Sequence, residues 1–457
     1  MSVPTTRGSD IHVWRWLAGR TEPVPLGALR VDGPQELHFA YRSDYLSRSD
    51  ATSISPDLPL REGWFAPAEY MSAPGAIRDA APDSWGRRVT LNALTGRSDR
   101  EVDVDFLPES TYLLESGSNR FGSLDFQSSD TMYSARDTTV DLSVLQQAAI
   151  LIESGEALAP HLTTLVGRKA PVGGARPKAI ITDEDGKQYI AKFSSSTDPM
   201  PVVESEAACL YLARHAGIDT PNTKVVRSLG KNVVLVERFD RGPGGTRIQA
   251  LSALTLTGLS EVEARYGSYP EFLDVLTTHS ADEGVGRELF ARVAFNIATS
   301  NTDDHLRNHA AFWDGQRLQL TPAYDLSPMM RSGDTASQAI AYGRDGERDS
   351  SFAGLIDTCS AYGLSRNEAI ESVDRMKGAV SDNWENAADF ARLSSSDRKL
   401  LYGRQILHPA ASYGMPQRVF APYMRTKPSF SHRRANECGA PTLKGTACQR
   451  HGQCPYH

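Results

Sequence analysis

The stretch FNIATSNTDDHLRNHAAFWDGQRLQLTPAYDLSP, from Phe295 to Pro328, sets two acidic centres and an Asn around a hairpin signal. Asp303 and Asn308 lie five residues apart in a predicted loop after an apolar helix. Asp325 follows two short apolar strands that Asp-Gly-Gln at 314–316 separates. Phosphoryl transfer needs groups in this order: a carboxylate for the acceptor hydroxyl, an amide oxygen for a metal, and a metal-binding carboxylate on a second loop. The hairpin predicts that Asp325 returns beside the first loop.

The polar residues of this loop also have simpler interpretations. Asp303 alone reads equally as a turn or helix cap, and Asp304 beside it is a rival for the role of base. We expect His305 to brace the loop by hydrogen bonding, and we count it with Asp303 as a catalytic candidate. A competing hypothesis joins these three residues with His309 as a metal-hydrolase site. They lie adjacent in one loop and lack the separated ligands that such sites use.

A second polar group lies upstream and predicts a nucleotide site. A Gly-rich loop precedes two predicted strands, 178–182 and 188–193, which a Glu-Asp-Gly turn joins. Glycines let successive backbone N–H groups approach an anion, and Lys192 ends the second strand where it can reach the same anion. A helix with acids near its start follows, from Val202 to a stop at Gly217. The candidate residues are Gly173, Gly174, Ala175, Lys178, Lys192 and Glu206.

The evidence for a nucleotide site lies in the order of these elements along the chain. Two glycines alone are typical of an ordinary turn, and no Lys-Ser/Thr follows them as a Walker loop requires. A Gly-rich loop, a hairpin, a Lys and then an acidic helix start is the order of the nucleotide lobe of protein kinases. The buried strand NVVLVERFD then reads as a hinge whose backbone at Glu237 and Phe239 meets adenine, or as a plain core strand before a loop.

The flanking segments complete an expected α+β fold: a two-lobed, protein-kinase-like body with an N-terminal α+β domain and an α-rich C-terminal lobe. The strands IHVWRWL and ELHFAY and the helix start PDSWGRR belong to the N-terminal domain. Nothing there gathers into a catalytic constellation, so we expect it to pack or to bind a partner. The predicted domains are 1–145, 146–260 for the nucleotide lobe, 261–412 for the α-rich lobe and 413–457 for a tail.

Composition limits the class of protein. The 457 residues have 23% charged and 40% hydrophobic side chains and a net charge of -7, which argues against a chain that coats nucleic acid or an anionic membrane. No apolar run approaches the roughly 20 residues of a membrane helix, and the start lacks the form of a signal peptide. We expect a cytoplasmic protein with no membrane partner. Of the five cysteines, Cys209 and Cys359 lie in apolar contexts typical of buried thiols.

The tail differs from the rest of the chain. Residues 418–457 hold seven Lys or Arg and one acid. Cys438, Cys448, Cys454 and His457 supply four ligands suited to a structural Zn²⁺, with His451 as an alternative fourth ligand. With so few apolar residues, metal would have to hold the segment together. The other interpretation is a disordered basic tail with free thiols. If zinc binds, the basic residues favour contact with nucleic acid or an acidic partner.

Three motifs together resemble the HipA family of serine/threonine kinase toxins: GGARPKA from Gly173, VERFDR from Val236, and NTDDHLRNH with TPAYDLSP. PDSWGRR also resembles the N-terminal domain of that family. The resemblance implies that Asp303 is the catalytic base, that Asn308 and Asp325 bind Mg²⁺, and that Lys192 holds the phosphates of ATP. It also implies hinge contacts to adenine at Glu237 and Phe239, with Asp240 near the ribose.

The same resemblance implies a biological role. Such kinases phosphorylate a protein, in known cases an aminoacyl-tRNA synthetase, and arrest growth. Many are neutralised by a helix-turn-helix antitoxin that also binds operator DNA, so nucleic acid would be an indirect partner. The Cys/His tail is an addition that the best-known members lack. Two other functions remain as alternatives: a catalytically silent ATP-binding regulator, or a nucleic-acid-binding module that acts through the tail.

Overall fold

The computed structural model describes residues 11–415 apart from 33–35, 97–102, 104–105, 137–140, 155, 157–175, 196–197 and 280–281. By its contacts the chain up to Met415 forms one compact unit. In the described part, no helix has the length and apolar character needed to cross a membrane. The two predicted buried thiols, Cys209 and Cys359, are buried and free.

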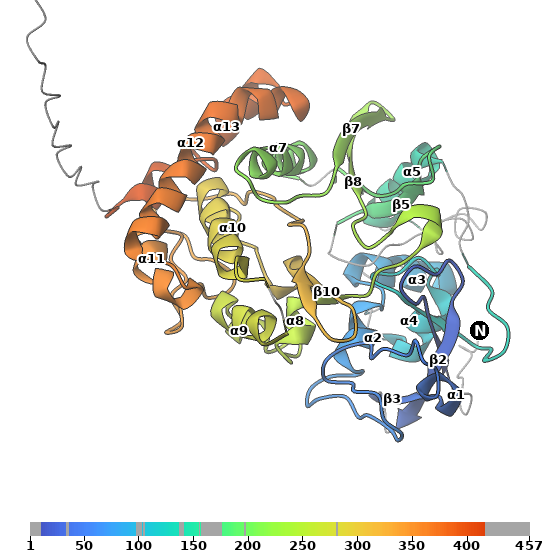
Figure 1. Ribbon diagram of the computed structural model, residues 1–457. Helices are drawn as coiled ribbons and strands as arrows, with labels where there is room; N and C mark the ends of the chain where they lie inside the picture. The colour runs from blue at the N-terminus through green and yellow to red at the C-terminus, as the bar shows by residue number, and fades with distance from the viewer. Residues whose placement is uncertain are drawn as a thin grey trace, which may run out of the picture. The chain divides into compact units, whose positions relative to one another are not determined.

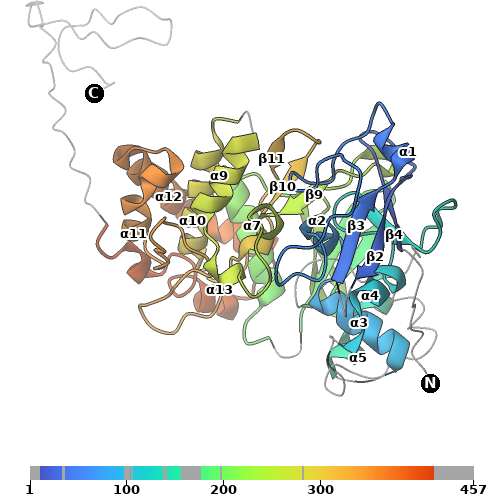
Figure 2. The ribbon, with the colours of Figure 1, turned by 90° about the horizontal axis from the view of Figure 1, so that it is seen from below.

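The N-terminal part is built on a four-stranded antiparallel sheet, which Figure 2 shows beside the small helices α3, α4 and α5. Its strands, in the order β3-β2-β1-β4, are β1 Ile11–Arg15, β2 Val24–Asp32, β3 Glu36–Tyr41 and β4 Leu124–Gln127. Alternate residues of β3 are buried, as a strand with one covered face requires. The helices are α1 Ser43–Leu46, α2 Gly75–Asp79, α3 Ser84–Thr95, α4 Glu109–Glu115 and α5 Leu142–Ser154.

A second antiparallel sheet, ordered β5-β6-β8-β7, forms the predicted nucleotide lobe. Its strands are β5 Lys178–Thr182, β6 Gln188–Phe193, β7 Thr223–Ser228 and β8 Lys231–Glu237. The predicted hairpin is present, and Gly186 takes a φ of 78° in its turn, which glycine adopts without strain. The helix α7, Val202–His215, is also where the sequence predicts it. Both faces of β8 are covered: Val233 and Leu235 pack with α3 and α5, whereas Val234 and Val236 join the main core with α7.

The remaining part is mostly helical, as expected (Figure 1). It contains β9 Ala250–Ser252, α8 Ala253–Leu256, α9 Tyr269–His279, α10 Val285–Thr299, β10 Ala310–Trp313, β11 Leu318–Leu320, α11 Phe352–Asp357, α12 Arg366–Phe390 and α13 Ser395–Leu401. The third sheet is ordered β11-β10-β9. The apolar face of α10 is fully buried and fixes the loop that follows it. α12 packs along α7, with the rings of Tyr211 and Phe390 5.3 Å apart.

Some expectations about element limits differ from the structure. The predicted boundary at 145/146 falls inside α5, and this helix packs on β5 and β6. The boundary at 260/261 falls after β9, although β9 pairs with β10 of the helical part. The domain limits stay predictions.

Candidate active site

A cavity of about 690 Å³ lies between the second sheet, the loop after α10 and the N-terminal domain. Nearly all of the predicted site residues that the structure describes line it: Lys178, Lys192, Glu206, Glu237, Phe239, Asp240, His305, Asn308 and Asp325. Asp303 is the one exception among them. Residues that are far apart in sequence therefore meet around one space of the size that small-molecule sites usually have.

Lys192 links two carboxylates in this cavity. Its ammonium donates to Glu206 of α7 at 2.5 Å and to Asp325 at 2.6 Å. The Lys192 charge holds the pKa of Asp325 down at about 2. Burial by itself lowers the pKa of Lys192, but the two carboxylates outweigh it and raise the pKa above its usual value. This arrangement joins the second sheet, α7 and the loop beyond the hairpin through one cation.

Asp325 has an unusual backbone. Its φ is 57°, in the left-handed region that non-glycine residues enter at a cost. The residue follows β11, and the hairpin β10–β11 returns the chain as predicted. Asn308, before the hairpin, lines the same cavity and donates weakly to the carbonyl of Asp303 at 3.4 Å. Asn308 and Asp325 thus line one cavity, and their roles as metal ligands stay predictions.

The neighbours Asp303 and Asp304 have opposite environments. Asp303 is exposed, whereas Asp304 is 1% exposed and accepts hydrogen bonds from Asn296 at 2.7 Å and from Tyr269. His309 Nε2 lies 2.8 Å from the same oxygen of Asp304. The carboxylate of Asp304 is thus committed to holding the loop onto α9 and α10. Asp303, by contrast, keeps an exposed carboxylate, and which of the two residues acts as base stays a prediction.

The structure corrects the expected role of His305. In the described part of the chain the buried Nδ1 of His305 has no hydrogen-bond partner, so this side chain does not brace the loop as predicted. His309 does so instead, through Asp304 and through edge contact with the ring of Tyr269 at 5.0 Å. The competing metal-hydrolase hypothesis also loses support, because the described residues hold no group of three or more His, Cys, Asp or Glu that could bind a metal ion.

The hinge after β8 is bonded to the N-terminal domain. Arg238 donates to the side chain of Asn119 at 2.8 Å and to the carbonyl of Arg120 at 2.6 Å. Asp240 accepts from the backbone N–H of Gly122 at 2.8 Å and from Arg238 at 2.7 and 2.9 Å. Arg241 donates to Asp240 as well, at 3.0 Å. Segments about 120 residues apart are therefore joined in a buried network.

This network gives Asp240 a structural role beside the expected one. The residue lines the cavity, but it is 2% exposed and both of its oxygens already accept hydrogen bonds. Burial opposes its ionised form, yet Arg238 and Arg241 outweigh burial and hold the pKa of Asp240 at about 2. Asp240 therefore has a structural role in this network, and its predicted contact with ribose stays a prediction.

Glu237 and Phe239 line the cavity at and after the end of β8, and their predicted contacts with adenine stay predictions. Glu237 ends β8, and its backbone N–H donates to the carbonyl of Asn222. The ring of Phe239 packs against two other rings: its centroid lies 6.2 Å from that of Phe121 and 5.3 Å from that of Tyr324. Phe239 thus joins the N-terminal domain to the loop before Asp325, in an aromatic group beside the cavity.

The N-terminal domain also contributes to the site, contrary to expectation. Asp83 caps α3 by accepting from Gly86 at 2.7 Å, and its other oxygen accepts from Lys178 at 3.0 Å in a buried ion pair. Trp85 donates to the carbonyl of Lys178 at 3.1 Å. The motif PDSWGRR could have pointed to this corner, but its Asp reads equally as a helix cap, and the structure shows that it serves both purposes.

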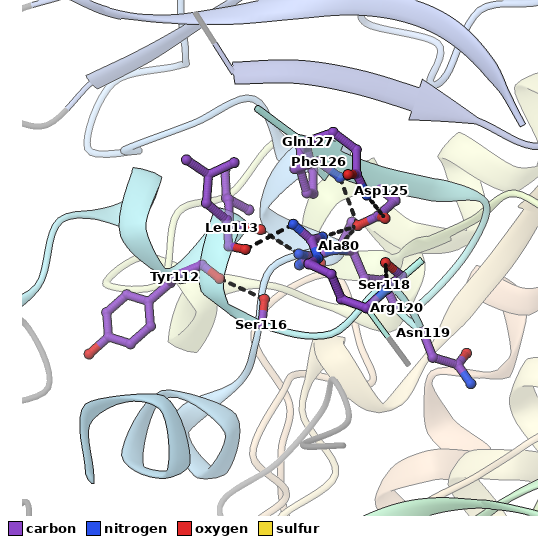
Figure 3. A network of polar contacts seen from close by, with 12 residues as sticks. Ala80, Tyr112, Leu113, Ser116, Ser118, Asn119, Arg120, Asp125, Phe126 and Gln127 are labelled. Atoms are coloured by element: carbon purple, nitrogen blue, oxygen red, sulfur yellow. Dashed lines mark hydrogen bonds and ion pairs between the residues drawn. The ribbon is translucent and has the colours of Figure 1, made fainter. Parts of the chain in front are cut away.

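Figure 3 shows what holds the loop that meets the hinge. Arg120 is fully buried and donates to Asp125 at 2.8 Å, to the carbonyl of Ala80 at 3.1 Å and to that of Leu113 at 2.5 Å. Asp125 also accepts from Gln127 at 2.9 Å. A buried cation that is bonded on every side fixes the loop 118–122, and through it the hinge.

Two groups of predicted site residues lie outside the described residues. They are the loop residues Gly173, Gly174 and Ala175, and the tail residues Cys438, Cys448, Cys454 and His457. Their predicted roles in phosphate and zinc binding stay predictions.

Two family models match the chain. The HipA N-terminal domain matches residues 20–127, and the HipA-like C-terminal domain matches residues 170–384. The chain belongs to the HipA family. The second match includes β5 to β11 and the loop with Asp303 and Asn308, and the first includes Asp83 and the loop 118–122.

Relatives agree with this family. The protein of Sinorhizobium fredii described as "Putative kinase Y4mE" is 24% identical over 337 residues, 68% of this chain and 76% of that protein. The serine/threonine-protein kinase toxin HipA of Shewanella oneidensis is 24% identical over 197 residues, 38% of this chain and 46% of that protein.

A solved structure shares the fold. It is the complex of the Shewanella oneidensis MR-1 toxin–antitoxin system HipA, HipB and operator DNA, one chain of which matches with a TM-score of 0.62 and 18% identity. The match covers 88% of this chain and 96% of that chain. The predicted α+β, kinase-like fold is confirmed, and the two relatives are named as kinases.

Proposed function

We propose that this HipA-family chain is an ATP-dependent protein kinase that transfers the γ-phosphoryl group to a Ser or Thr hydroxyl. The observation that supports it most is the contact of Lys192 with both Glu206 and Asp325 in one cavity. In protein kinases, a strand Lys that pairs with a helix Glu holds the phosphates, and a loop Asp beyond the catalytic loop binds metal.

The residues of the cavity fit the magnesium that this reaction uses. Asn308 and Asp325 offer the hard oxygen donors that Mg²⁺ prefers, and the lowered pKa of Asp325 keeps its carboxylate ionised. Bound there, the ion would neutralise charge on the phosphates. Lys192 would exchange its bond to Asp325 for one to the nucleotide, which frees the carboxylate for the metal. Lys178, held by Asp83, would add a second cation.

Asp303 then acts on the acceptor. Its exposed carboxylate would orient the incoming hydroxyl and take its proton, while Asp304 holds the loop in place. Adenine would lie against the hinge, near the backbone of Glu237 and Phe239. Gly173, Gly174 and Ala175 would cover the phosphates.

A toxin role is the finer part of the proposal. One relative is named a kinase toxin, and the solved complex pairs HipA with HipB and operator DNA. By this analogy, the chain would arrest growth by modifying a translation enzyme of the aminoacyl-tRNA synthetase type. A helix-turn-helix antitoxin would neutralise it, and contact with nucleic acid would be indirect or through the basic tail.

The test is transfer from labelled ATP. Purified wild-type chain is mixed with Mg²⁺, labelled ATP and a cell extract, and the reaction is repeated with Asp303→Ala and Asp325→Ala. We expect the wild type to label a protein and both variants to lose this activity. A wild type that binds ATP but labels nothing would instead support the silent regulator. Identification of the labelled protein tests the translation target, and growth on induced expression tests toxicity.

A further inference from the structure

A chain of contacts connects the N-terminal domain to the loop that holds Asp303 and Asn308. It runs from α2 of that domain through α8 to the short 3-10 helix Leu306–Asn308. Asp79 of α2 accepts hydrogen bonds from the hydroxyl and from the backbone N–H of Ser252, both at 2.7 Å, where α8 begins. α8 therefore lies between the N-terminal domain and the loop, in contact with both.

Glycines allow close packing on both sides of this connection. A Cβ at Gly75 of α2 would lie 2.6 Å from the Cγ2 of Thr255 in α8, so a larger residue there would force a shift. A Cβ at Gly267 would likewise collide with the side chain of Leu306. Tightly packed segments have low compressibility and transmit strain. A displacement of α2 should therefore be passed on to the loop.

One carboxylate joins the two ends of the connection. Glu261, which follows α8, forms an ion pair with Arg307 of the loop. The same oxygen of Glu261, Oε1, lies 3.8 Å from Nε of Arg78 in α2. Arg78 is itself fixed, because it donates hydrogen bonds to the carbonyl of Leu259 at 2.8 Å and to Thr255 at 3.2 Å. Glu261 thus lies between an arginine of the N-terminal domain and an arginine of the loop.

Arg307 lies beside both predicted metal ligands. It directly precedes Asn308 in the chain. Its carbonyl accepts a hydrogen bond at 2.7 Å from the hydroxyl of Tyr324, the residue before Asp325. A side chain that holds Arg307 in place therefore helps to fix the backbone that presents Asn308 and Asp325 to the cavity.

From these contacts, and resting on the proposed kinase function, we propose that Glu261 is a positioning residue for phosphoryl transfer. It acts through Arg307, and it holds the loop with Asp303 and Asn308 in the position that Arg78 and the N-terminal domain set. Positioning of the reacting groups acts on the rate of transfer more than on the affinity for ATP. Loss of Glu261 should therefore lower kcat and leave the KM for ATP nearly unchanged.

The size of the effect follows from the exposure of the pair. The side chains of Glu261 and Arg307 are 51% and 42% exposed. Exposed ion pairs contribute little, so their loss cannot disturb the loop strongly. We expect a fall of about fivefold in kcat, which corresponds to about 1 kcal/mol.

The experiment uses the full chain with Mg²⁺, labelled ATP and a fixed amount of cell extract. The maximal rate of transfer to extract protein, the ATP concentration at half that rate and the Tm are measured. The variants are Glu261→Gln, Arg307→Gln and the double variant. Asp357→Asn is the matched control, because Asp357 of α11 is an exposed carboxylate that pairs with Arg366 at 2.6 Å.

The proposal is supported if Glu261→Gln lowers the maximal rate about fivefold while the Tm and the ATP concentration at half rate stay those of the wild type. The double variant should then be no slower than Arg307→Gln, because residues that act through one another do not give additive losses. Asp357→Asn should keep the wild-type rate.

The other outcomes overturn the proposal. An unchanged rate in Glu261→Gln, or additive losses in the double variant, would show that Glu261 does not act through Arg307, and the kinase function would stand. A change confined to the ATP concentration at half rate would make Glu261 a nucleotide contact instead. A rate that falls only as the folded fraction falls would make it a residue of stability alone. A wild type that labels no protein overturns both the positioning role and the kinase function.

Discussion

Arg238, in the hinge after β8, donates a hydrogen bond to the side chain of Asn119 in the N-terminal domain at 2.8 Å. The same Asn119 oxygen accepts from Arg241 at 2.9 Å, and its amide donates to Gln188 of β6 at 2.9 Å. One side chain thus connects the N-terminal domain, the hinge and the second sheet. The N-terminal domain holds the hinge rather than lying beside it.

Replacement of Asn119 should therefore weaken nucleotide binding. Asn119→Ala leaves buried donors of Arg238 and Arg241 without their acceptor, which costs about 1–3 kcal/mol. We expect the KM for ATP to rise about tenfold, with a much smaller change in kcat. Asn383→Ala is the control, since Asn383 also donates one hydrogen bond, at 2.8 Å, but lies in α12. An equal rise in KM in both variants would contradict a specific role of the hinge contact.

Protonation of Glu206 should weaken nucleotide binding at low pH. Burial raises the pKa of Glu206, although the charge of Lys192 opposes this effect. The carboxylate therefore takes up its proton at a pH above the usual glutamate pKa of about 4.3. We expect affinity for an ATP analogue to fall as the pH drops through that raised pKa, because Lys192 loses its partner. Binding measured by calorimetry from pH 8 downward checks this. In Glu206→Gln the step should be absent, whereas Glu204→Gln, on the same helix, should keep it.

The loss of nucleotide binding at low pH should not result from unfolding of the chain. A raised folded-state pKa means that the folded chain binds the Glu206 proton more tightly than the unfolded chain, so this group adds stability as the pH falls. Asp325 has the opposite sign: its lowered pKa stabilises the fold above about pH 3.9, and this stability is lost toward pH 2. Circular dichroism at each pH should therefore show a folded chain where binding is already lost. If binding and the circular dichroism signal are lost at the same pH, the loss of binding does not come from Glu206 alone.

Substitutions of the adjacent residues Asp303 and Asp304 should affect different properties. We expect the first to reduce activity and the second to reduce stability. Asp303→Asn changes an exposed side chain, so we expect an unchanged Tm and a loss of transfer of roughly 10²- to 10⁴-fold. Asp304→Asn disturbs a buried acceptor of Asn296 and Tyr269 and should cost about 1–3 kcal/mol of stability. Thermal unfolding and transfer assays on both variants check this. The reverse pattern would make Asp304 the base.

The buried pair of Arg120 and Asp125 should be costly to break. The side chains are 2% and 0% exposed and 2.8 Å apart. Asp125→Ala leaves a buried guanidinium without its carboxylate, so we expect a loss of about 3–5 kcal/mol in the free energy of unfolding. Urea denaturation measures it. Asp44→Ala, which removes one of the two acidic partners of Arg42 at an exposed position, should change stability by no more than about 1 kcal/mol.

The tail prediction is tested by metal content. Zinc in the full chain and in Cys438→Ser with Cys454→Ser can be compared by elemental analysis. We expect about one zinc per chain, lost in the double variant, because removal of two thiolates leaves too few ligands for a tetrahedral site. Cys209→Ser, a change at a buried thiol of α7, is the control. Equal zinc in the wild type and the double variant would exclude these ligands.

Much of the kinase-like part could be predicted because its signals are local. The turn at Gly186 and the apolar pattern of α7 are read within a few residues, and the structure has these elements where they were expected. The hairpin before Asp325 likewise returns the chain to the cavity that Asn308 lines, as predicted. These features depend on backbone periodicity and turn chemistry, which the sequence shows directly.

The sequence by itself therefore determined the residue types of the site and the order in which the chain presents them. Only the tertiary structure decided which of those residues remain available. It buried Asp304 against Tyr269, enclosed Asp240 between two arginines and brought Asp83 to Lys178, 95 residues away. Ion pairing and burial depend on contacts between distant segments, so no local pattern could show that the N-terminal domain forms a wall of the site.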